Sequence, residues 1–453
     1  MKKTGLLFLL LASLTGVAQK EDSAFIKRIS DEVFNNGKAY DNLRELTKNI
    51  GGRLAGSPQM YKAEAWGQAT LKKSGADKVW LQECMVPHWV RGGKDVAVAN
   101  YKGGKKPLDV LALGNSMGSG PKGVQAEVLK VNSFDDLEAK KDQVKGKIVF
   151  YNYKFINSNV NTFESYGDAG KYRGAGPSRA AKYGAVGVVV RSMSHSVDNN
   201  PHTGATRYDT AYAKIPAVAV GLRDADWLND LTDKETVKLN MVTNGKFFPD
   251  TPGHNVIGEL TGSEYPDQYI TIGGHLDSWD PAEGAHDDGA GIVQTIEILR
   301  AFKALGYTPK HTIRFVLFAN EENGLRGGTK YGEEAVAKKE KHVFALESDA
   351  GGFTPRGFGL EMNDEQIAKV KKWQPLLEPY GAGRLEKGGD GADIGPAADA
   401  LKFPSAGLNP DSQRYFDYHH ARNDVLENVN KRELELGAVA MAALIYLVDK
   451  YGL

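Results

Sequence analysis

The second half of the chain alternates between short apolar runs and stretches with a helical pattern. Residues 269–272, 312–319 and 343–346 are apolar and suited to β-strands. An apolar helical run follows at 292–302, and the chain closes with an amphipathic stretch at 432–451. Alternation of this kind predicts a mostly parallel sheet that is sandwiched between helices.

Each of these strand-like runs leads into side chains that can bind metal ions. His275 comes after two glycines that follow the first run, and Asp349 follows the third run. The second run ends in Glu321 and Glu322, which point in different directions, so that one can bind metal while the other serves as a base. Because ligands gather outside the carboxyl ends of strands in such sheets, we expect these side chains to lie close together.

Three more residues extend this set. A tight turn of small residues contains Asp287, whose carboxylate can lie between two cations, and His420 supplies a late histidine. Asp277 stands two residues after His275. From there it can accept a hydrogen bond from the imidazole nitrogen that is not used for metal, which would fix the tautomer of the ring.

The chemistry of these residues points to zinc. Histidine and carboxylate ligands without a thiolate suit Zn²⁺, with Co²⁺ or Mn²⁺ as substitutes. Five protein ligands exceed one structural zinc site, so the pattern predicts two ions that share Asp287. Such a pair lies roughly 3.5–4 Å apart and leaves a position for a shared water or hydroxide. The sequence therefore predicts a two-metal hydrolase.

The order of these motifs carries a family resemblance. The succession His-x-Asp, Asp-Asp-Gly-x-Gly, Glu-Glu-x-Gly, Ser-Asp-Ala-Gly and a late histidine resembles peptidase family M28 of zinc exopeptidases. The resemblance implies an α/β protein with a three-layer zinc-exopeptidase fold, together with an inserted β-rich domain similar to a protease-associated domain. The zinc ligands that it implies, with Asp287 bridging, are His275, Asp287, Glu322, Asp349 and His420.

Further roles follow from the same resemblance. Glu321 becomes the general base, which takes a proton from the bridging water and passes it to the leaving amine. His419, directly before the last ligand, is expected to help hold the tetrahedral oxyanion. Apart from the resemblance, Asp393 lies in a glycine-rich stretch and is a candidate to receive a substrate ammonium. His286 stands where a small or apolar residue is more familiar, and no role for it follows from the sequence.

The domain organisation can be predicted from changes in composition. Two lysines precede an apolar run at 6–14, and small residues suited to cleavage follow it, which is typical of a secretory signal peptide. We therefore expect an exported protein, periplasmic or extracellular. Short β-like runs separated by long Gly-, Ser-, Asn- and Tyr-rich loops mark the insert. The expected units are a signal peptide at 1–18, an M28-like peptidase domain at 19–118 and 246–453, and the protease-associated-like insert at 119–245.

Charge and cysteine content exclude some classes of function. The 57 basic and 57 acidic residues balance, which argues against nucleic acid or an anionic membrane as the main partner. After the first apolar run no stretch is long and apolar enough to cross a bilayer. Cys84 is the single cysteine, so no intrachain disulfide can form. The expected partner is a peptide substrate, and the resemblance also allows a homodimer.

Three functions are open at this point. The first is a dinuclear zinc exopeptidase for dipeptides or short peptides, acting as a dipeptidase, an aminopeptidase or a carboxypeptidase. The second is a single-zinc enzyme of the glutaminyl-cyclase type, against which His275 and a bridging Asp287 argue. The third is a non-catalytic binding protein on the same scaffold, although such chains usually lose a ligand or the base. Recognition of the substrate's terminal ammonium or carboxylate decides the polarity of cleavage, and that pocket is not readable in the sequence.

Overall fold

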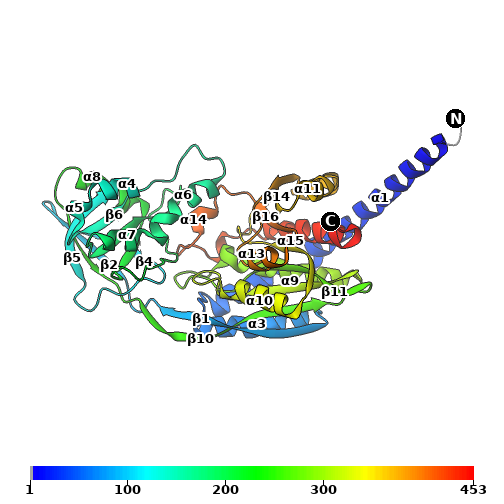
Figure 1. Ribbon diagram of the computed structural model, residues 1–453, viewed down its shortest axis with the longest axis horizontal. Coiled ribbons are helices and arrows are strands. Elements are labelled where there is room, and N and C mark those ends of the chain that lie inside the picture. Colours follow the sequence, from blue (N-terminus) through cyan, green and yellow to red (C-terminus); the bar gives the residue numbers. More distant parts are fainter. Residues whose placement is uncertain (1–3) are drawn as a thin grey trace.

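The computed structural model describes the backbone of residues 4–453 and the side chains of residues 19–453. The expected signal peptide at 1–18 lies outside the residues whose side chains are described, and its backbone from residue 4 is the start of helix α1 (Thr4–Asn36). Within the described residues, no helix has the length and apolar character needed to span a membrane. The chain forms two lobes, each built around one sheet (Figure 1).

The first sheet is the centre of the main lobe. Its strands are β1 (Lys78–Val90), β10 (Lys246–Leu260), β11 (Tyr265–His275), β12 (His311–Phe318), β13 (Lys341–Glu347), β14 (Pro355–Glu361), β15 (Arg384–Lys387) and β16 (Ser405–Pro410). Their order is β1-β10-β12-β11-β13-β16-β14-β15. The central strands β12, β11, β13 and β16 run parallel, whereas β10 and β14 join them in antiparallel pairs.

Helices cover both faces of this sheet. Successive strand residues point to opposite faces, so Leu317 packs into one core while Val316 and Phe318 pack into the other. The larger core contains α1, α2 (Ala39–Arg44), α3 (Pro58–Lys73), α9 (Ala290–Ala304) and α15 (Lys431–Tyr451). The smaller core contains α10 (Arg326–Lys338) and α13 (Gly395–Leu401). The predicted α/β fold with a mostly parallel central sheet is confirmed.

Local sequence explains where helices α3 and α15 begin. The side chain of Ser57 accepts a hydrogen bond from the N–H of Met60, and Pro58 opens α3. The side chain of Asn430 accepts hydrogen bonds from the N–H groups of Arg432 and Glu433 at the start of α15. These caps satisfy backbone donors that have no partner inside the helix.

The second sheet forms the insert lobe, which we define as residues 91–245. Its strands are β2 (Val96–Tyr101), β3 (Gly104–Leu108), β4 (Val110–Ala112), β5 (Val124–Val131), β6 (Ile148–Tyr151), β7 (Gly187–Arg191), β8 (Ala217–Val220) and β9 (Lys238–Val242). Their order is β3-β2-β9-β5-β6-β7-β8-β4. Helices α6 (Thr162–Gly174) and α7 (Gly176–Lys182) cover one face, and α8 (Leu222–Thr232) covers the other.

The second sheet begins earlier in the chain than the expected insert. Strand β2 pairs with β9 and β4 pairs with β8, so the sheet starts at Val96 rather than after residue 118. The partners β9 and β8 come more than a hundred residues later, and a local pattern therefore does not reveal to which sheet β2 and β4 belong. The likeness of the insert to a protease-associated domain stays a prediction.

The two lobes are joined by the paired strands β1 and β10 and by a shared apolar contact (Figure 1). Phe353, Tyr415 and Phe416 of the main lobe belong to the same buried cluster as Phe155 and Tyr172 of the insert lobe. Helix α14 (Tyr415–Tyr418) carries two of these aromatic residues and ends directly before the predicted histidines. The insert lobe therefore packs beside the candidate site.

Candidate metal centre

The ends of three parallel strands place most of the candidate side chains at one edge of the main sheet. Strand β11 ends at His275, which pairs in register with Phe318 at the end of β12. The chain then continues from β12 to Glu322 and from β13 to Asp349. Asp287 lies in the irregular helical turn Ala285–Gly289 that precedes α9. The structure thus brings side chains from four separate segments to this edge.

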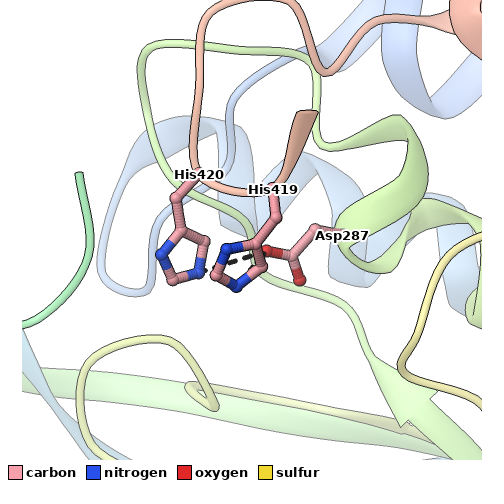
Figure 2. A group of neighbouring side chains, drawn as sticks. All are labelled: Asp287, His419 and His420. Carbon is pink, nitrogen blue, oxygen red and sulfur yellow. Dashed lines mark ion pairs between the residues drawn. The ribbon is translucent and has the colours of Figure 1, made fainter. Parts of the chain in front are cut away.

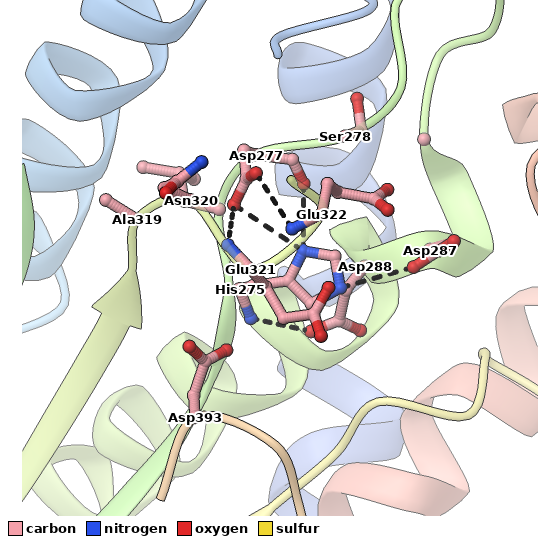
Figure 3. A network of polar contacts seen from close by, with 12 residues as sticks. His275, Asp277, Ser278, Asp287, Asp288, Ala319, Asn320, Glu321, Glu322 and Asp393 are labelled. Carbon is pink, nitrogen blue, oxygen red and sulfur yellow. Dashed lines mark hydrogen bonds and ion pairs between the residues drawn. The ribbon is translucent and has the colours of Figure 1, made fainter. Parts of the chain in front are cut away.

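The carboxylate of Asp287 lies between two imidazole rings. Its Oδ1 is 3.2 Å from Nε2 of His275 (Figure 3). Its Oδ2 is 3.2 Å from Nε2 of His420 (Figure 2). Nε2 of His275 also lies 3.3 Å from Oδ1 of Asp349, and Nε2 of His420 lies 3.0 Å from Oε2 of Glu322. The five predicted ligands therefore form two groups of three that share Asp287.

This set of donors fits metal ions. Oε1 of Glu322 is buried and has no hydrogen-bond partner among the described residues. Burial and the nearby charge of Asp287 raise the pKa of Glu322 to about 7. Burial alone would lower the pKa of His420, but Glu322 and Asp287 raise it to about 10. Because buried carboxylates are costly without compensating positive charge, cations bound here would stabilise the site.

Asp277 makes different contacts from those expected. Nδ1 of His275 lies 3.0 Å from the backbone carbonyl oxygen of Asp277, whereas the Asp277 carboxylate is 3.8 Å from that nitrogen. The carboxylate instead accepts hydrogen bonds from the N–H groups of Glu321 at 3.0 Å and Glu322 at 3.3 Å (Figure 3). The Asp277 side chain therefore orients the two glutamates.

Glu321 lies near His275 and Asp349, and His419 lies near the shared carboxylate of Asp287. Burial, together with the charges of Asp349 and Glu322, raises the pKa of Glu321 well above its usual value. The ring of His419 is stacked on that of His420 at 3.6 Å between centroids, and its Nε2 is 3.7 Å from Oδ2 of Asp287 (Figure 2). Burial, and then the charge of His420, lowers the pKa of His419 well below its usual value. His419 is therefore a neutral ring at the edge of the site.

Asp393 is buried with both carboxylate oxygens unpaired among the described residues. Figure 3 shows it on the side of the site where Glu321 and His275 lie. Its backbone N–H donates to the carboxylate of Glu347, the last residue of β13. Burial and the charges of Glu347 and Glu321 raise the pKa of Asp393 well above its usual value. When ionised, Asp393 offers two acceptor oxygens at this end of the site.

The structure gives His286 a packing role. Its ring is stacked on Phe353 at 4.2 Å and on Tyr418 at 5.3 Å between centroids. Nδ1 accepts a hydrogen bond of 3.1 Å from the N–H of Gly352, so Nε2 carries the proton and donates to the carbonyl of Asn428 at 3.2 Å. Burial lowers the pKa of His286 to about 4. A neutral histidine therefore fills this aromatic gap and satisfies two backbone groups.

Three residues that support the site were not assigned a role from the sequence. Asp424 accepts hydrogen bonds from the N–H groups of His286 at 2.7 Å and Asp287 at 3.1 Å. Asp288 accepts one from the N–H of His275 at 3.0 Å. The fully buried guanidinium of Arg53 donates to backbone carbonyls of the loop that links β11 to α9. Those carbonyls belong to Leu276, Glu283 and Gly284.

The sequence contained a weak signal for these supporting residues. Arg53 is a long charged residue within the cluster of chain breakers Gly-Gly-Arg-Leu-Ala-Gly, and Asp424 follows closely after His420. Both act on backbone atoms of segments that are distant in the chain. Their partners therefore become visible only in the fold.

Known proteins share this fold and sequence. A model of peptidase family M28 matches residues 255–445. Carboxypeptidase Q of Homo sapiens is 34% identical over 439 residues, which cover 95% of this chain and 90% of that protein. A peptidase M28 precursor from Shewanella amazonensis SB2B has a TM-score of 0.89 at 32% identity, covering 95% of this chain and 97% of the other. A zinc aminopeptidase of Bacillus subtilis shares the fold, with a TM-score of 0.64 at 20% identity and coverage of 90% and 94%. The chain belongs to peptidase family M28.

Proposed function

We propose that this M28 enzyme is an exported dinuclear zinc exopeptidase that hydrolyses dipeptides or short peptides. The observation that carries the proposal is the position of Asp287, with one carboxylate oxygen facing each imidazole. One ion would be held by His275, Asp349 and Asp287. The other would be held by His420, Glu322 and Asp287. The names of the relatives, a carboxypeptidase and a zinc aminopeptidase, agree with this class of reaction.

Different residues near the proposed metal ions would carry out different steps of peptide hydrolysis. When bound, two zinc ions would activate a water molecule as the nucleophile and polarise the scissile carbonyl. The carboxylate of Glu321 takes the proton of the attacking water and delivers it to the nitrogen of the leaving amine, as the C–N bond breaks. Burial and neighbouring carboxylates raise the pKa of Glu321, which favours the protonated form between the two proton transfers. The neutral His419 donates an N–H to the oxyanion that develops on the carbonyl.

We assign recognition of the substrate's free ammonium to Asp393. A buried carboxylate without hydrogen bonds is unfavourable, and a cationic partner supplied by the substrate would satisfy both oxygens. The position of Asp393 beside Glu321 supports an ammonium subsite at the end of the site from which the proton is transferred. This assignment favours an aminopeptidase or a dipeptidase over an enzyme that reads only a free carboxylate.

The two alternative functions receive less support. A single-zinc cyclase would need only one group of ligands, whereas this chain has two groups that share Asp287. A non-catalytic binding protein has no use for a base, whereas Glu321 has its backbone held by Asp277 and a raised pKa. Both observations favour catalysis by a pair of metal ions.

Export is inferred from the first eighteen residues. Their charged start, apolar run and small-residue end match the pattern of a secretory signal peptide. N-terminal sequencing of the protein recovered from the periplasm or the medium would then begin at Gln19. Recovery of the uncleaved chain from the cytoplasm alone would contradict export.

The proposed reaction can be tested with one series of dipeptides and one metal analysis. The zinc-loaded enzyme is given dipeptides with free, N-acetylated or C-amidated ends, and Glu321→Gln serves as the blank. We expect two zinc ions per chain by mass spectrometry, cleavage of the free dipeptides and loss of cleavage on acetylation. Absence of cleavage throughout the series, or binding of a single zinc ion, would overturn the proposal.

A further inference from the structure

A loop of the insert lobe contacts the backbone that carries the last predicted metal ligand. This loop is the segment Pro-His-Thr-Gly at 201–204. Nδ1 of His202 lies 2.8 Å from the carbonyl oxygen of His419. The N–H of Thr203 donates a hydrogen bond of 2.9 Å to the carbonyl oxygen of His420. Both carbonyl groups of the histidine pair are therefore bound by the insert lobe.

The contact of His202 is fixed in direction. A carbonyl oxygen only accepts, so Nδ1 of His202 carries the hydrogen of this bond. The side chain is 4% exposed, and burial lowers its pKa to about 4, so the ring is neutral at physiological pH. Its Nε2 has no hydrogen-bond partner among the described residues. The bond to His419 is thus the polar contact that sets the orientation of the ring.

The loop is itself anchored to the second sheet. The N–H of His202 donates to Oγ of Ser192 at 2.9 Å, and that hydroxyl donates to the carbonyl of Val220 at 2.7 Å. Val220 is the last residue of β8, and Ser192 follows β7 directly. The backbone of His202 is therefore anchored to the sheet of the insert lobe.

The backbone of His420 needs such support. Its φ of 60° lies in the left-handed region, which is unfavourable for a residue with a side chain. The approach is also tight, because a Cβ added to Gly204 would lie 2.6 Å from Nδ1 of His420 and 2.5 Å from Nη1 of Arg173. Contacts from outside the main lobe therefore hold an unfavourable conformation in place.

The same loop contacts the ring of His420. The carbonyl oxygen of Thr203 lies 3.3 Å from Nδ1 of His420, and Nη1 of Arg173 lies 3.4 Å from that oxygen and 3.2 Å from that nitrogen. The guanidinium only donates, so its approach to Nδ1 is not a hydrogen bond when Nδ1 carries the ring hydrogen. In that tautomer the Thr203 carbonyl accepts the ring N–H and leaves the opposite nitrogen free to bind a metal ion. That opposite nitrogen, Nε2, is the one that faces Glu322 and Asp287.

We propose that the insert lobe positions a metal ligand, with His202 and Thr203 holding the His419–His420 backbone so that Nε2 of His420 faces Glu322 and Asp287. His202 is then a positioning residue that acts through the peptide backbone. The inference rests on the proposed role of His420 as a zinc ligand. The insert lobe would then contribute to metal binding, although all five proposed ligands belong to the main lobe.

The test compares zinc affinity in two variants of similar size. His202→Leu removes the donor, whereas His202→Asn keeps an N–H close to the position of Nδ1. Zinc binding to the full chain is measured by competition with a chromogenic chelator. We expect His202→Leu to lower the affinity for one of the two zinc ions by about 10–100-fold, because loss of a group that orients a metal ligand typically has an effect of this size. His202→Asn should keep most of the wild-type affinity.

Two controls separate positioning from a general loss of stability. His195→Leu changes another histidine of the insert lobe, whose ring packs against Phe155 at 5.1 Å, and should leave zinc affinity unchanged. Thermal unfolding of the metal-free proteins shows whether the variants fold alike. If His202→Leu does not fold, His202→Ala, which lacks the donor and adds no bulk, takes its place.

The outcomes distinguish this inference from the proposed function. Wild-type zinc affinity in the donor-free variant, while His420→Ala loses an ion, would overturn the positioning role and leave the function intact. Equal weakening by Asn and Leu would also overturn it, because the donor would then be irrelevant. Unchanged zinc binding in His420→Ala would instead refute the ligand assignment on which both proposals depend.

Discussion

The carboxylate of Asp277 holds the backbone of Glu321 through a hydrogen bond of 3.0 Å from the Glu321 N–H. Its second oxygen accepts the N–H of Glu322 at 3.3 Å. One fully buried carboxylate thus orients both the proposed base and a proposed ligand. The side chains of adjacent residues at the end of a strand leave the backbone in different directions. Because Asp277 holds the backbone of both glutamates, Glu321 and Glu322 can take different roles.

Replacing Glu321 by glutamine should separate catalysis from metal binding. The amide keeps the shape of the side chain but does not accept the proton of the attacking water. We expect unchanged zinc content and a fall in kcat by about 10²–10⁴-fold, which is the typical contribution of a general base. Metal analysis and steady-state kinetics on a dipeptide measure the two quantities. Retention of wild-type kcat would remove Glu321 as the base.

Replacing Asp287 by alanine should remove zinc. Its two oxygens face the two histidines, so the change takes one donor from each group of ligands. We expect the stoichiometry to fall from two ions to one or none at zinc concentrations that saturate the wild type. Asp250 is exposed, and Asp250→Ala serves as the control that should still bind two ions. Two ions bound in Asp287→Ala would argue against a shared carboxylate.

Replacing Asp393 by asparagine should weaken recognition of a free ammonium. A hydrogen bond to a charged group is worth about 1.5–3 kcal/mol, so we expect kcat/KM for free dipeptides to fall by roughly 10–150-fold. Asp390→Asn is a matched control in the same loop, where Oδ2 of Asp390 accepts a hydrogen bond from Ser405. An equal loss for both variants would show that the effect belongs to the loop and not to the carboxylate.

Replacing Arg53 by methionine should destabilise the protein. The buried guanidinium donates to three backbone carbonyls, and a buried acceptor without its donor costs about 1–3 kcal/mol. We expect the free energy of unfolding of the metal-free protein, measured with urea, to fall by about 3 kcal/mol or more. A change below about 1 kcal/mol would mean that water or local rearrangement satisfies these carbonyls.

The contact between Arg314 and Glu340 should make the stability of the protein depend on pH in the acid range. Burial alone would raise the pKa of Glu340 from 4.5, but hydrogen bonds from His342 and Arg314 lower it to about 2. A depressed pKa in the folded state stabilises the protein fully above the unfolded pKa, and this contribution is lost as the pH falls from 4.5 towards 2. Glu340→Gln should lower stability at neutral pH and reduce the acid slope by up to about 1.4 kcal/mol per pH unit. Urea unfolding at a series of pH values measures this slope, and parallel curves for the two proteins would contradict the assignment.

The sequence predicted the fold and the candidate ligands because both depend on local patterns. His275, Glu322 and Asp349 each follow an apolar run that forms a parallel strand of the main sheet. Parallel strands place their carboxyl ends at one edge, so the convergence of these side chains could be anticipated.

Contacts between distant segments could not be predicted in this way. Arg53 acts on a loop more than two hundred residues later, and Asp277 contacts Glu321 with its carboxylate, whereas its backbone carbonyl faces His275. His202 lies in the insert lobe, and nothing in its neighbourhood in the sequence indicates contact with His419. Sequence patterns define which elements form, whereas the supporting hydrogen bonds depend on how those elements pack.

The pairing of β1 with β10 has a consequence for how the chain folds. The two strands pair from Lys78 opposite Glu259 to Val90 opposite Lys246, and the whole insert lobe lies between them in the sequence. Closing so long a flexible loop carries an entropy cost that grows with its length. Once the second sheet has formed, the two ends of the insert lie side by side, and that cost has already been met by the insert's own folding. Strands β1 and β10 can then pair across the folded insert, whose two ends are already close together, instead of across a long disordered loop.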